Sequence, residues 1–311
     1  MKTNILFVFF IAMLLGFGGC RKGNEGASIT VASYNIRNAN AGDSARGNGW
    51  GKRYPVIADL VRFHEFDIFG TQEGFRHQLE DLKNALPGYD YTGAGRDDGK
   101  EKGEHSAIFY RTGLFDLLDK GDFWLSETPD KPGKGWDAVL PRICSWGHFR
   151  HKPSGKEFLF FNLHMDHVGK QARVESAFLV QEKMKEFGSE LPAVLTGDFN
   201  VDQTHSSYNA FVEKGVLLDS YVAADFRYAE NGTFNSFDPG NFTESRIDHI
   251  FVSPVFRVKK YGVLTDTYRS VREEGNDKTE VRDAPQEITV RHYQARTPSD
   301  HFPIMAVLEL K

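Results

Sequence analysis

The amino-acid sequence predicts an α+β fold in which two mixed or antiparallel sheets pack face to face, with helices on their outer sides. Three observations lead to this prediction. Several strand-length runs, such as residues 158–161 (Phe-Leu-Phe-Phe), are apolar on both faces and need cover on both sides. The helical patterns are few and amphipathic, as expected of helices that cover a sheet. Aromatic residues form 13% of the 311 residues, and the 30 glycines suit tight turns between strands.

The first 28 residues are expected to direct the chain to the cell envelope. Residues 5–17 form an apolar run behind Lys2, and it is shorter than the ~20 residues of a spanning helix, so we interpret residues 1–19 as a signal peptide. Residues 17–20 (Phe-Gly-Gly-Cys) resemble the lipobox of bacterial lipoproteins, which predicts a lipid on Cys20, a tether over 20–28 and a lipid-anchored, periplasmic or cell-surface protein. An ordinary secretory signal with an incidental cysteine is the alternative.

Residues 29–311 are expected to form one domain, because no Pro-, Gly- or Ser-rich linker interrupts the middle of the chain. Apolar runs of strand length predict the strands, and apolar residues at helical spacing predict the helices. The predicted strands cover residues 29–35, 67–72, 106–111, 142–150, 157–164, 193–198, 246–253, 255–264 and 301–310. The predicted helices cover residues 52–65, 75–86 and 169–187.

The helix over 169–187 is expected to bury one apolar face and to expose a charged one. The two sets are Val174, Ala177, Phe178, Met184 and Phe187 on the apolar face, and Lys170, Arg173, Glu182 and Lys183 on the charged face. The polar stretch from 266 to 299 is expected to be a long surface loop with a hairpin around 287–292.

Charge and cysteine content narrow the function. The 38 basic and 43 acidic residues give a net charge of -5, which removes the broad cationic field of sequence-independent nucleic-acid binding but allows a local basic patch. If Cys20 carries a lipid, Cys144 is the one free thiol, and no intramolecular disulfide forms. Cys144 lies in a strand-like run without a partner at metal-ligand spacing, so a packed thiol is expected.

Polar residues that could carry metal or phosphate chemistry recur where the apolar runs stop. Strand ends hold side chains rigidly at one rim of a sheet sandwich, so these residues predict a catalytic site there. Each has a structural alternative, such as a turn residue or a carboxylate at a helix N-terminus. The residues are Asn35, Glu73, His164, Asp198 with Asn200, Asp248, and the pair Asp300 and His301.

Residues 164–167 (His-Met-Asp-His) partly match the zinc signature of metallo-β-lactamase-like hydrolases, but Asn162 stands where its first histidine is expected. A second ligand-rich cluster at matching spacing is missing from the sequence. Zinc is therefore a weak alternative.

Six segments together resemble the endonuclease/exonuclease/phosphatase superfamily and occur in its order. They are residues 34–37 (Tyr-Asn-Ile-Arg), 71–73 (Thr-Gln-Glu), 162–164 (Asn-Leu-His), 197–200 (Gly-Asp-Phe-Asn), 246–251 (Arg-Ile-Asp-His-Ile-Phe) and 298–304 (Pro-Ser-Asp-His-Phe-Pro-Ile). The resemblance covers roughly residues 29–310. It implies a four-layer αββα sandwich and hydrolysis of phosphoesters that depends on Mg²⁺, with Mn²⁺ as the alternative ion.

The resemblance also implies a metal site. Glu73 is expected to be the main carboxylate ligand, with Asn35 beside it and Asp300 contributing directly or through water. Oxygen ligands of this kind suit magnesium, which keeps several waters, whereas zinc would require more His or Cys.

The other matched residues are expected to handle protons and phosphate. Asp198, helped by Asn200, resembles the residue that orients and deprotonates the attacking water. His301 resembles the histidine that contacts the scissile phosphate, and Asp248 its carboxylate partner, which would keep the imidazole charged near neutral pH. His164 resembles a second phosphate-contacting histidine that can protonate the leaving oxygen.

The predicted activity is hydrolysis of a phosphodiester or phosphomonoester by in-line attack of an activated water. Arg142 is the candidate for a phosphate contact because its fork matches phosphate oxygens, although a surface arginine at a strand start is an equal alternative. The lipid anchor would hold the site near a membrane, which favours lipid-derived or scavenged small phosphoesters. The alternative functions are a nuclease for extracellular nucleic acid, which the acidic chain disfavours, and a non-catalytic surface lipoprotein that binds glycans or polyanions. No protein partner is inferred.

Overall fold

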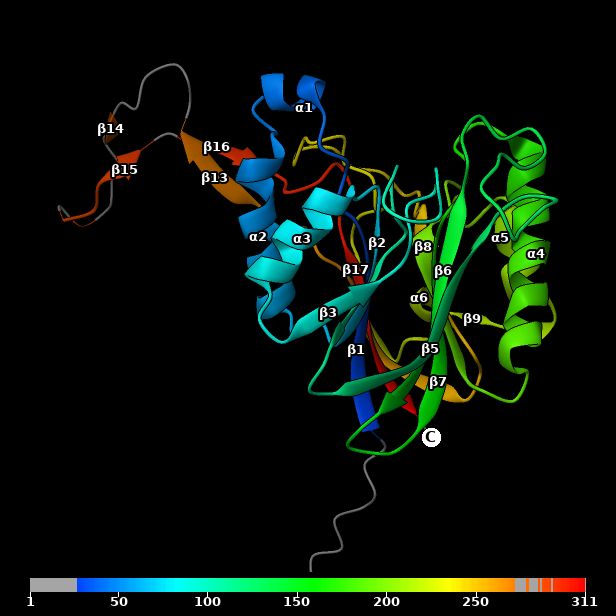
Figure 1. Cartoon of the computed structure of the whole chain (residues 1–311). Helices are drawn as coiled ribbons and strands as arrows, with labels where there is room; N and C mark the ends of the chain where they lie inside the picture. The colour runs from blue at the N-terminus through cyan, green and yellow to red at the C-terminus, as the bar shows by residue number, and fades with distance from the viewer. Residues whose placement is uncertain (1–26, 272–277, 280–284, 286, 292, 311) are drawn as a thin grey trace, which may run out of the picture.

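The computed structural model describes residues 27–271, 278–279, 285, 287–291 and 293–310, which form four layers (Figure 1). Two sheets face each other in the middle. Helices α2 (Trp50–Phe63) and α3 (Arg76–Ala85) cover one sheet, and α4 (Lys170–Gly188) and α5 (Ser206–Val212) cover the other. The predicted α+β sandwich of two packed sheets flanked by helices is confirmed.

The first sheet has seven strands in the order β10-β12-β17-β1-β2-β4-β3. Strand β1 lies at its centre, antiparallel to β17 and parallel to β2, so the sheet is mixed. The bounds are β1 Ala27–Asn35, β2 Ile68–Gln72, β3 Tyr89–Thr92, β4 Ile108–Arg111, β10 Phe226–Tyr228, β12 Phe256–Val263 and β17 Ile304–Leu310.

The second sheet has six strands in the order β5-β6-β7-β8-β11-β9. Only β7 and β8 are parallel, and the other neighbours are antiparallel. The bounds are β5 Phe115–Trp124, β6 Ile143–His151, β7 Glu157–His164, β8 Ala193–Asp198, β9 Leu218–Asp219 and β11 Asp248–Val252.

Shorter elements complete the described part of the chain. They are α1 Ala41–Ala45, a 3₁₀ helix Glu213–Gly215, α6 Ser220–Ala223, β13 Tyr268–Val271, β14 Lys278–Thr279, β15 Val290–Arg291 and β16 Tyr293–Arg296. Among the described helices, none combines the length and the hydropathy needed to span a bilayer.

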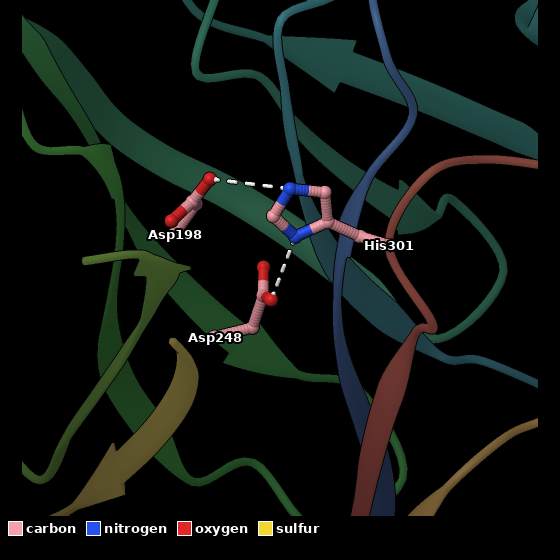
Figure 2. A group of neighbouring side chains, drawn as sticks. All are labelled: Asp198, Asp248 and His301. Carbon is pink, nitrogen blue, oxygen red and sulfur yellow. Dashed lines mark hydrogen bonds and ion pairs between the residues drawn. The ribbon is translucent and has the colours of Figure 1, made fainter. Parts of the chain in front are cut away.

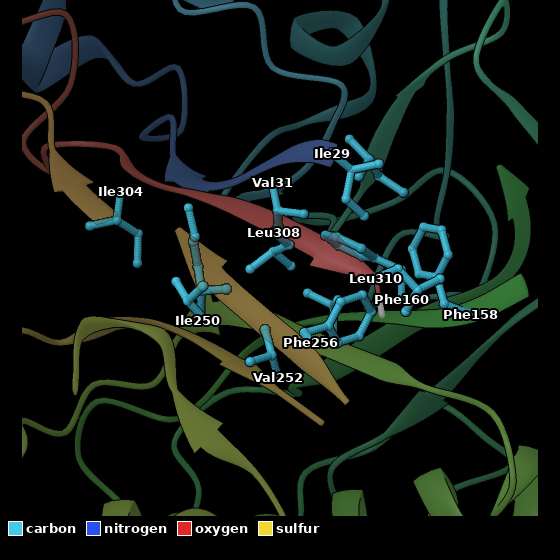
Figure 3. Packing of buried hydrophobic residues seen from close by; sticks show 14 of the residues in the cluster. Ile29, Val31, Phe158, Phe160, Ile250, Val252, Phe256, Ile304, Leu308 and Leu310 are labelled. Carbon is cyan, nitrogen blue, oxygen red and sulfur yellow. The ribbon is translucent and has the colours of Figure 1, made fainter. Parts of the chain in front are cut away.

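Apolar side chains fill the space between the two sheets. Val31 and Leu308 from the first sheet lie in one cluster with Phe160 and Ile250 from the second, and all four are fully buried (Figure 3). Burying one such side chain contributes roughly 1.5–3 kcal/mol, so this layer holds the sheets together. Two further clusters lie on the outer sides, where the helices pack against the sheets.

Strand β5 is absent from the sequence prediction. All three predicted helices are present, with ends within two residues of those predicted. Strand β5 differs because it is an edge strand that pairs only with β6. Its middle residues, Leu118 to Lys120, are exposed, so the apolar alternation that predicts a strand is interrupted there.

The predicted faces of α4 are partly wrong. Ala177 is fully buried as predicted, but Phe178 is 53% exposed and Arg173 is buried. Small side chains, among them Ala172 and Ser176, face the second sheet instead. The Arg173 guanidinium donates one hydrogen bond inside the protein, to the Asp166 carbonyl (3.0 Å).

The predicted hairpin around 287–292 is wrong in its pairing, and positions 286 and 292 lie outside the described residues. Strand β15 pairs with β14, and β16 pairs with β13, so each strand pairs with an earlier segment of the polar stretch and not with its neighbour in the sequence. A local apolar pattern indicates a strand but does not identify its partner. In Figure 1 these strands extend away from the sandwich.

The predicted signal peptide, 1–19, and the lipidated Cys20 lie outside the described residues, as does most of the tether. Strand β1 begins at Ala27, two residues before the predicted start of the domain. Cys144 is buried, and burial raises the pKa of its thiol well above the ordinary value. The prediction of a packed thiol is therefore confirmed.

Candidate active site

Strand ends from both sheets meet at one edge of the sandwich. Asp198, the last residue of β8, lies in register with His164 at the end of β7 and with Asp248 at the start of β11. Asn35 ends β1 in the other sheet, and its Nδ2 donates a hydrogen bond to Asp198 Oδ2 (3.0 Å). The segment before β17 adds His301 to this group. Residues far apart in the sequence are thus brought together as predicted.

His301 lies between two carboxylates (Figure 2). Its Nδ1 is 2.8 Å from Asp248 Oδ2, and its Nε2 is 3.8 Å from Asp198 Oδ2. Burial by itself would lower the pKa of His301, but the charges of Asp248 and Asp198 outweigh it and raise the pKa well above its ordinary value. The imidazole is therefore cationic at neutral pH, as the sequence predicts.

Asp198 is a buried carboxylate at the centre of this group. Its Oδ1 accepts a hydrogen bond from the Asn200 backbone N–H (2.9 Å), while the Asn200 side chain donates to the Met165 carbonyl. Burial and the charge of Asp248 together raise the pKa of Asp198 to about 7, although His301 opposes the rise. A carboxyl group with a pKa near neutrality can accept a proton from a reacting water.

His164 has the opposite protonation state from His301. Its Nε2 is 3.5 Å from Asp198 Oδ2, and its Nδ1 has no protein partner among the described residues. Burial lowers the pKa of His164 well below the ordinary value, and the nearby guanidinium groups of Arg142 and Arg96 lower it further. A neutral His164 can donate one N–H to a substrate oxygen, which favours a contact with phosphate over transfer of a proton.

Glu73 follows β2 and lies beside Asn35. Its Oε1 accepts a hydrogen bond from Asn35 Nδ2 (3.1 Å), and its Oε2 accepts from the backbone N–H (3.2 Å) and Nδ2 (3.1 Å) of Asn38. Its backbone has a φ of 65°, a left-handed conformation that is rare for a residue with a side chain. These contacts hold the carboxylate at the strand end despite the backbone strain.

Asp300 and Glu73 both approach the same cationic atom. Arg37 NH1 lies 3.4 Å from Asp300 Oδ2 and 3.7 Å from Glu73 Oε2. Burial raises the pKa of Asp300, His301 opposes the rise, and the Glu73 carboxylate adds to it. Two carboxylates that repel each other and face one point are a favourable arrangement for a divalent cation.

Arg53 is fully buried and connects two segments that carry site residues. Its guanidinium donates hydrogen bonds to the carbonyls of Ile36 (2.7 Å), Arg37 (3.0 Å) and Pro298 (3.0 Å). It thus links the segment after Asn35 to the segment that carries Asp300. Arg53 could not be predicted from the sequence because an arginine in a helical pattern is normally exposed.

The described residues line an open cavity of about 540 Å³ at this edge. Every predicted site residue except Asn35 and Asp248 lines it, and these two lie directly behind Asp198 and His301. The lining residues are Arg37, Asn38, Glu73, Arg96, Glu104, Leu140, Arg142, His164, His167, Asp198, Asn200, Phe234, Ser236, Ile247, Asp300 and His301. Arg96, Glu104 and Phe234 lie in loops, where the sequence analysis identified no signal.

Arg142 lies in the cavity wall and is only 3% exposed, so the alternative of a surface arginine does not apply. Its Nε donates to Asp166 Oδ2 (3.3 Å). Asp166 also accepts the backbone N–H groups of Val168 (3.0 Å) and Gly169 (2.8 Å). Burial would raise the pKa of Asp166, but these N–H groups and Arg142 lower it to about 2. Its contacts are thus those of a structural carboxylate, which does not support the zinc alternative.

One group of side chains in the described part of the chain has the spacing of metal ligands. Ligand atoms of Asp198, Asp248 and His301 lie within 4.8 Å of one another and could hold a metal ion. This set differs from the predicted Asn35, Glu73 and Asp300. It is less suited to magnesium, because Nδ1 of His301 already pairs with Asp248 and magnesium prefers oxygen ligands.

Comparison with known proteins identifies the fold and chemistry. A model of the endonuclease/exonuclease/phosphatase family matches residues 32–301. The chain belongs to the endonuclease/exonuclease/phosphatase family. The predicted family membership is thus confirmed, and family members depend on divalent metals.

Two solved structures from Bacteroides thetaiotaomicron resemble this family member over nearly its whole length. One is a mannosyl-6-phosphatase, with 72% identity, a TM-score of 0.83, and coverage of 90% of this chain and 99% of that one. The other is described as an endonuclease/exonuclease/phosphatase family protein, with 71% identity, a TM-score of 0.86, and coverage of 92% and 99%. A protein of Acanthamoeba polyphaga mimivirus is 30% identical, covering 68% of this chain and 83% of its own.

The family assignment makes the protein a phosphoester hydrolase, which confirms the prediction of an enzyme. The non-catalytic alternative is not supported. The individual roles of the site residues and the identity of the metal stay predictions.

Proposed function

We propose that this enzyme is a magnesium-dependent phosphomonoesterase that removes phosphate from carbon 6 of mannose, in a glycan or a free sugar phosphate. The observation that supports it most is the joint presence, in one cavity, of a cationic His301, an Asp198 with a pKa of about 7, and the carboxylates of Glu73 and Asp300. The 72% identity to a mannosyl-6-phosphatase supports the choice of substrate.

Glu73, Asn35 and Asp300 are the residues that would hold the magnesium ion. They offer hard oxygen donors, and the two carboxylates already face a common point beside Arg37. When bound, a divalent cation stabilises the negative charge that develops on the phosphoryl oxygens. The positive charge of Arg37 offsets the repulsion between the two carboxylates and keeps them in place.

The remaining site residues activate the attacking water and bind the phosphoryl group. Asp198, oriented by Asn35 and Asn200, accepts a proton as water attacks phosphorus in line with the sugar oxygen. The bond from phosphorus to that oxygen breaks, and the sugar leaves as an alcohol after its oxygen takes up a proton from solvent. The cationic His301 stabilises the charge on the phosphoryl group, and Asp248 keeps it protonated. His164 donates its single N–H to a substrate oxygen.

The test compares release of inorganic phosphate from mannose 6-phosphate, release of p-nitrophenol from bis-p-nitrophenyl phosphate and shortening of single-stranded DNA, with magnesium and after chelation. We expect mannose 6-phosphate to be the fastest substrate, with activity lost on chelation and restored by added Mg²⁺. Faster hydrolysis of DNA or of the diester would contradict the proposal and favour the nuclease alternative. Full activity in chelator would contradict the metal requirement.

We further propose that a lipid at Cys20 anchors the enzyme in the cell envelope. The support is the apolar run over 5–17 followed by the lipobox-like residues 17–20. We expect the full chain expressed in a Gram-negative host to appear in the membrane fraction, and Cys20→Ser to be released into the soluble periplasmic fraction. Equal partitioning of the two forms would contradict lipidation.

A further inference from the structure

Two buried arginines line one side of the catalytic cavity. Arg96 lies in the loop between β3 and β4, and Arg142 lies directly before β6. Their side chains are 10% and 4% exposed. Both also border a crevice too narrow for a water molecule that reaches His164, so they lie next to this histidine.

Each arginine retains a buried N–H without a partner. Arg96 Nη1 donates to Glu104 Oε2 (2.5 Å), but Arg96 Nε makes no hydrogen bond among the described residues, and Asp97 Oδ1, the carboxylate oxygen beside it, lies 3.9 Å away. Arg142 contacts Asp166 through Nε and His167 Nδ1 through NH2 (2.9 Å), but its NH1 has no acceptor there either. A buried donor without an acceptor costs free energy, which a ligand oxygen would recover.

The surrounding structure holds both guanidinium groups in place before any ligand binds. The Trp124 indole N–H donates to the Arg96 carbonyl (2.7 Å), and Asn38 Nδ2 donates to Glu104 (3.2 Å). On the other side, Asp166 is fixed by two backbone N–H groups and in turn fixes Arg142. Binding of an anion therefore requires little additional ordering of these side chains.

The positive charges of Arg96 and Arg142 also repel each other. Burial lowers the pKa of the Arg142 guanidinium, and the charge of Arg96 lowers it further. Both arginines likewise disfavour protonation of His164. Positive groups that repel each other at the wall of a cavity are stabilised when an anion with more than one charged oxygen binds between them.

We propose that Arg96 and Arg142 bind the second negative charge of a phosphomonoester and so make the enzyme select monoesters over diesters. This rests on the proposed phosphomonoesterase function. A monoester dianion presents terminal oxygens to both free N–H groups. In a diester, a second ester group replaces one of these oxygens, which removes an acceptor and one negative charge.

The test measures kcat/KM for p-nitrophenyl phosphate and for bis-p-nitrophenyl phosphate in wild type, Arg96→Gln and Arg142→Gln. For each variant we expect monoester hydrolysis to fall at least ~10-fold more than diester hydrolysis, since each loses one charge-assisted hydrogen bond to the dianion. Arg150→Gln is the matched control, because Arg150 lies near the other end of β6 and is exposed. It should leave the ratio unchanged.

Equal losses on both esters in the two variants would overturn the proposal. A wild type that prefers the diester would instead contradict the phosphomonoesterase function, so the two failures are distinguishable. Calorimetry with inorganic phosphate and metal-free protein provides a measurement independent of turnover. We expect affinity at least ~10-fold weaker in Arg96→Gln and Arg142→Gln, and intermediate in the lysine variants, which keep the charge but lose the fork. Unchanged phosphate affinity would also overturn the proposal.

Discussion

Replacing His301 with alanine is expected to lower kcat/KM for mannose 6-phosphate by at least ~100-fold, the usual cost of losing a main electrostatic donor in a hydrolytic site. His301 is buried between Asp248 and Asp198, and these carboxylates keep it cationic. Alanine removes the positive charge that faces the phosphoryl group. It also leaves two buried carboxylates facing each other without the imidazolium between them.

A second substitution tests the positive charge of His301 while the imidazole itself is retained. Asp248→Asn retains the shape of the partner but removes the charge that raises the pKa of His301, so we expect a loss in the same direction. The exposed His77 on α3 is the matched control, and His77→Ala should retain full activity. Steady-state kinetics would be paired with thermal unfolding to exclude misfolding. Wild-type rates in folded His301→Ala would refute the role of this residue.

Replacing Glu73 with glutamine is expected to weaken Mg²⁺ binding and to lower turnover by at least ~100-fold at the Mg²⁺ concentration that saturates wild type. Glutamine has the same shape and can adopt the same backbone conformation, but it lacks the charge. The carboxylate of Glu73 accepts hydrogen bonds from Asn35 and Asn38, so its oxygens are fixed at the strand end. The substitution therefore changes mainly the electrostatic attraction for the cation.

Two measurements check this prediction. Calorimetry of Mg²⁺ binding to the substrate-free protein should give a weaker affinity in Glu73→Gln, and a large excess of Mg²⁺ should restore part of the activity. Glu182→Gln, at an exposed position on α4, is the control and should behave like wild type. An unchanged Mg²⁺ affinity in Glu73→Gln would instead favour the group of Asp198, Asp248 and His301 as the metal site.

The positions of the main site residues could be predicted from the sequence because they follow a local rule. A polar residue that ends an apolar strand lies where the strands of the sheet end, next to other strand ends. This rule identified Asn35, His164 and Asp198. The order of the six segments then identified the family. Neither step needs knowledge of which strands are neighbours.

Residues that reach the site from loops could not be predicted in this way. Arg96 lies in a loop whose shape depends on close contacts, since a Cβ at Gly95 would lie 2.3 Å from the Lys102 carbonyl oxygen. Arg53 contributes through backbone carbonyls of distant segments. The pairing of β13 with β16 was missed for a related reason, because a distant partner strand leaves no local pattern. Edge strand β5 was missed because its exposed middle residues interrupt the apolar alternation.

The sequence by itself determined the two-sheet architecture, the family and the set of acids, amides and histidines available for catalysis, because hydrophobic periodicity and residue order are written in the chain. Only the tertiary structure decided their protonation. His301 and His164 are both buried, yet the first is cationic beside two carboxylates and the second is neutral beside two arginines. A pKa depends on burial and on neighbouring charges, which exist only after the chain has folded.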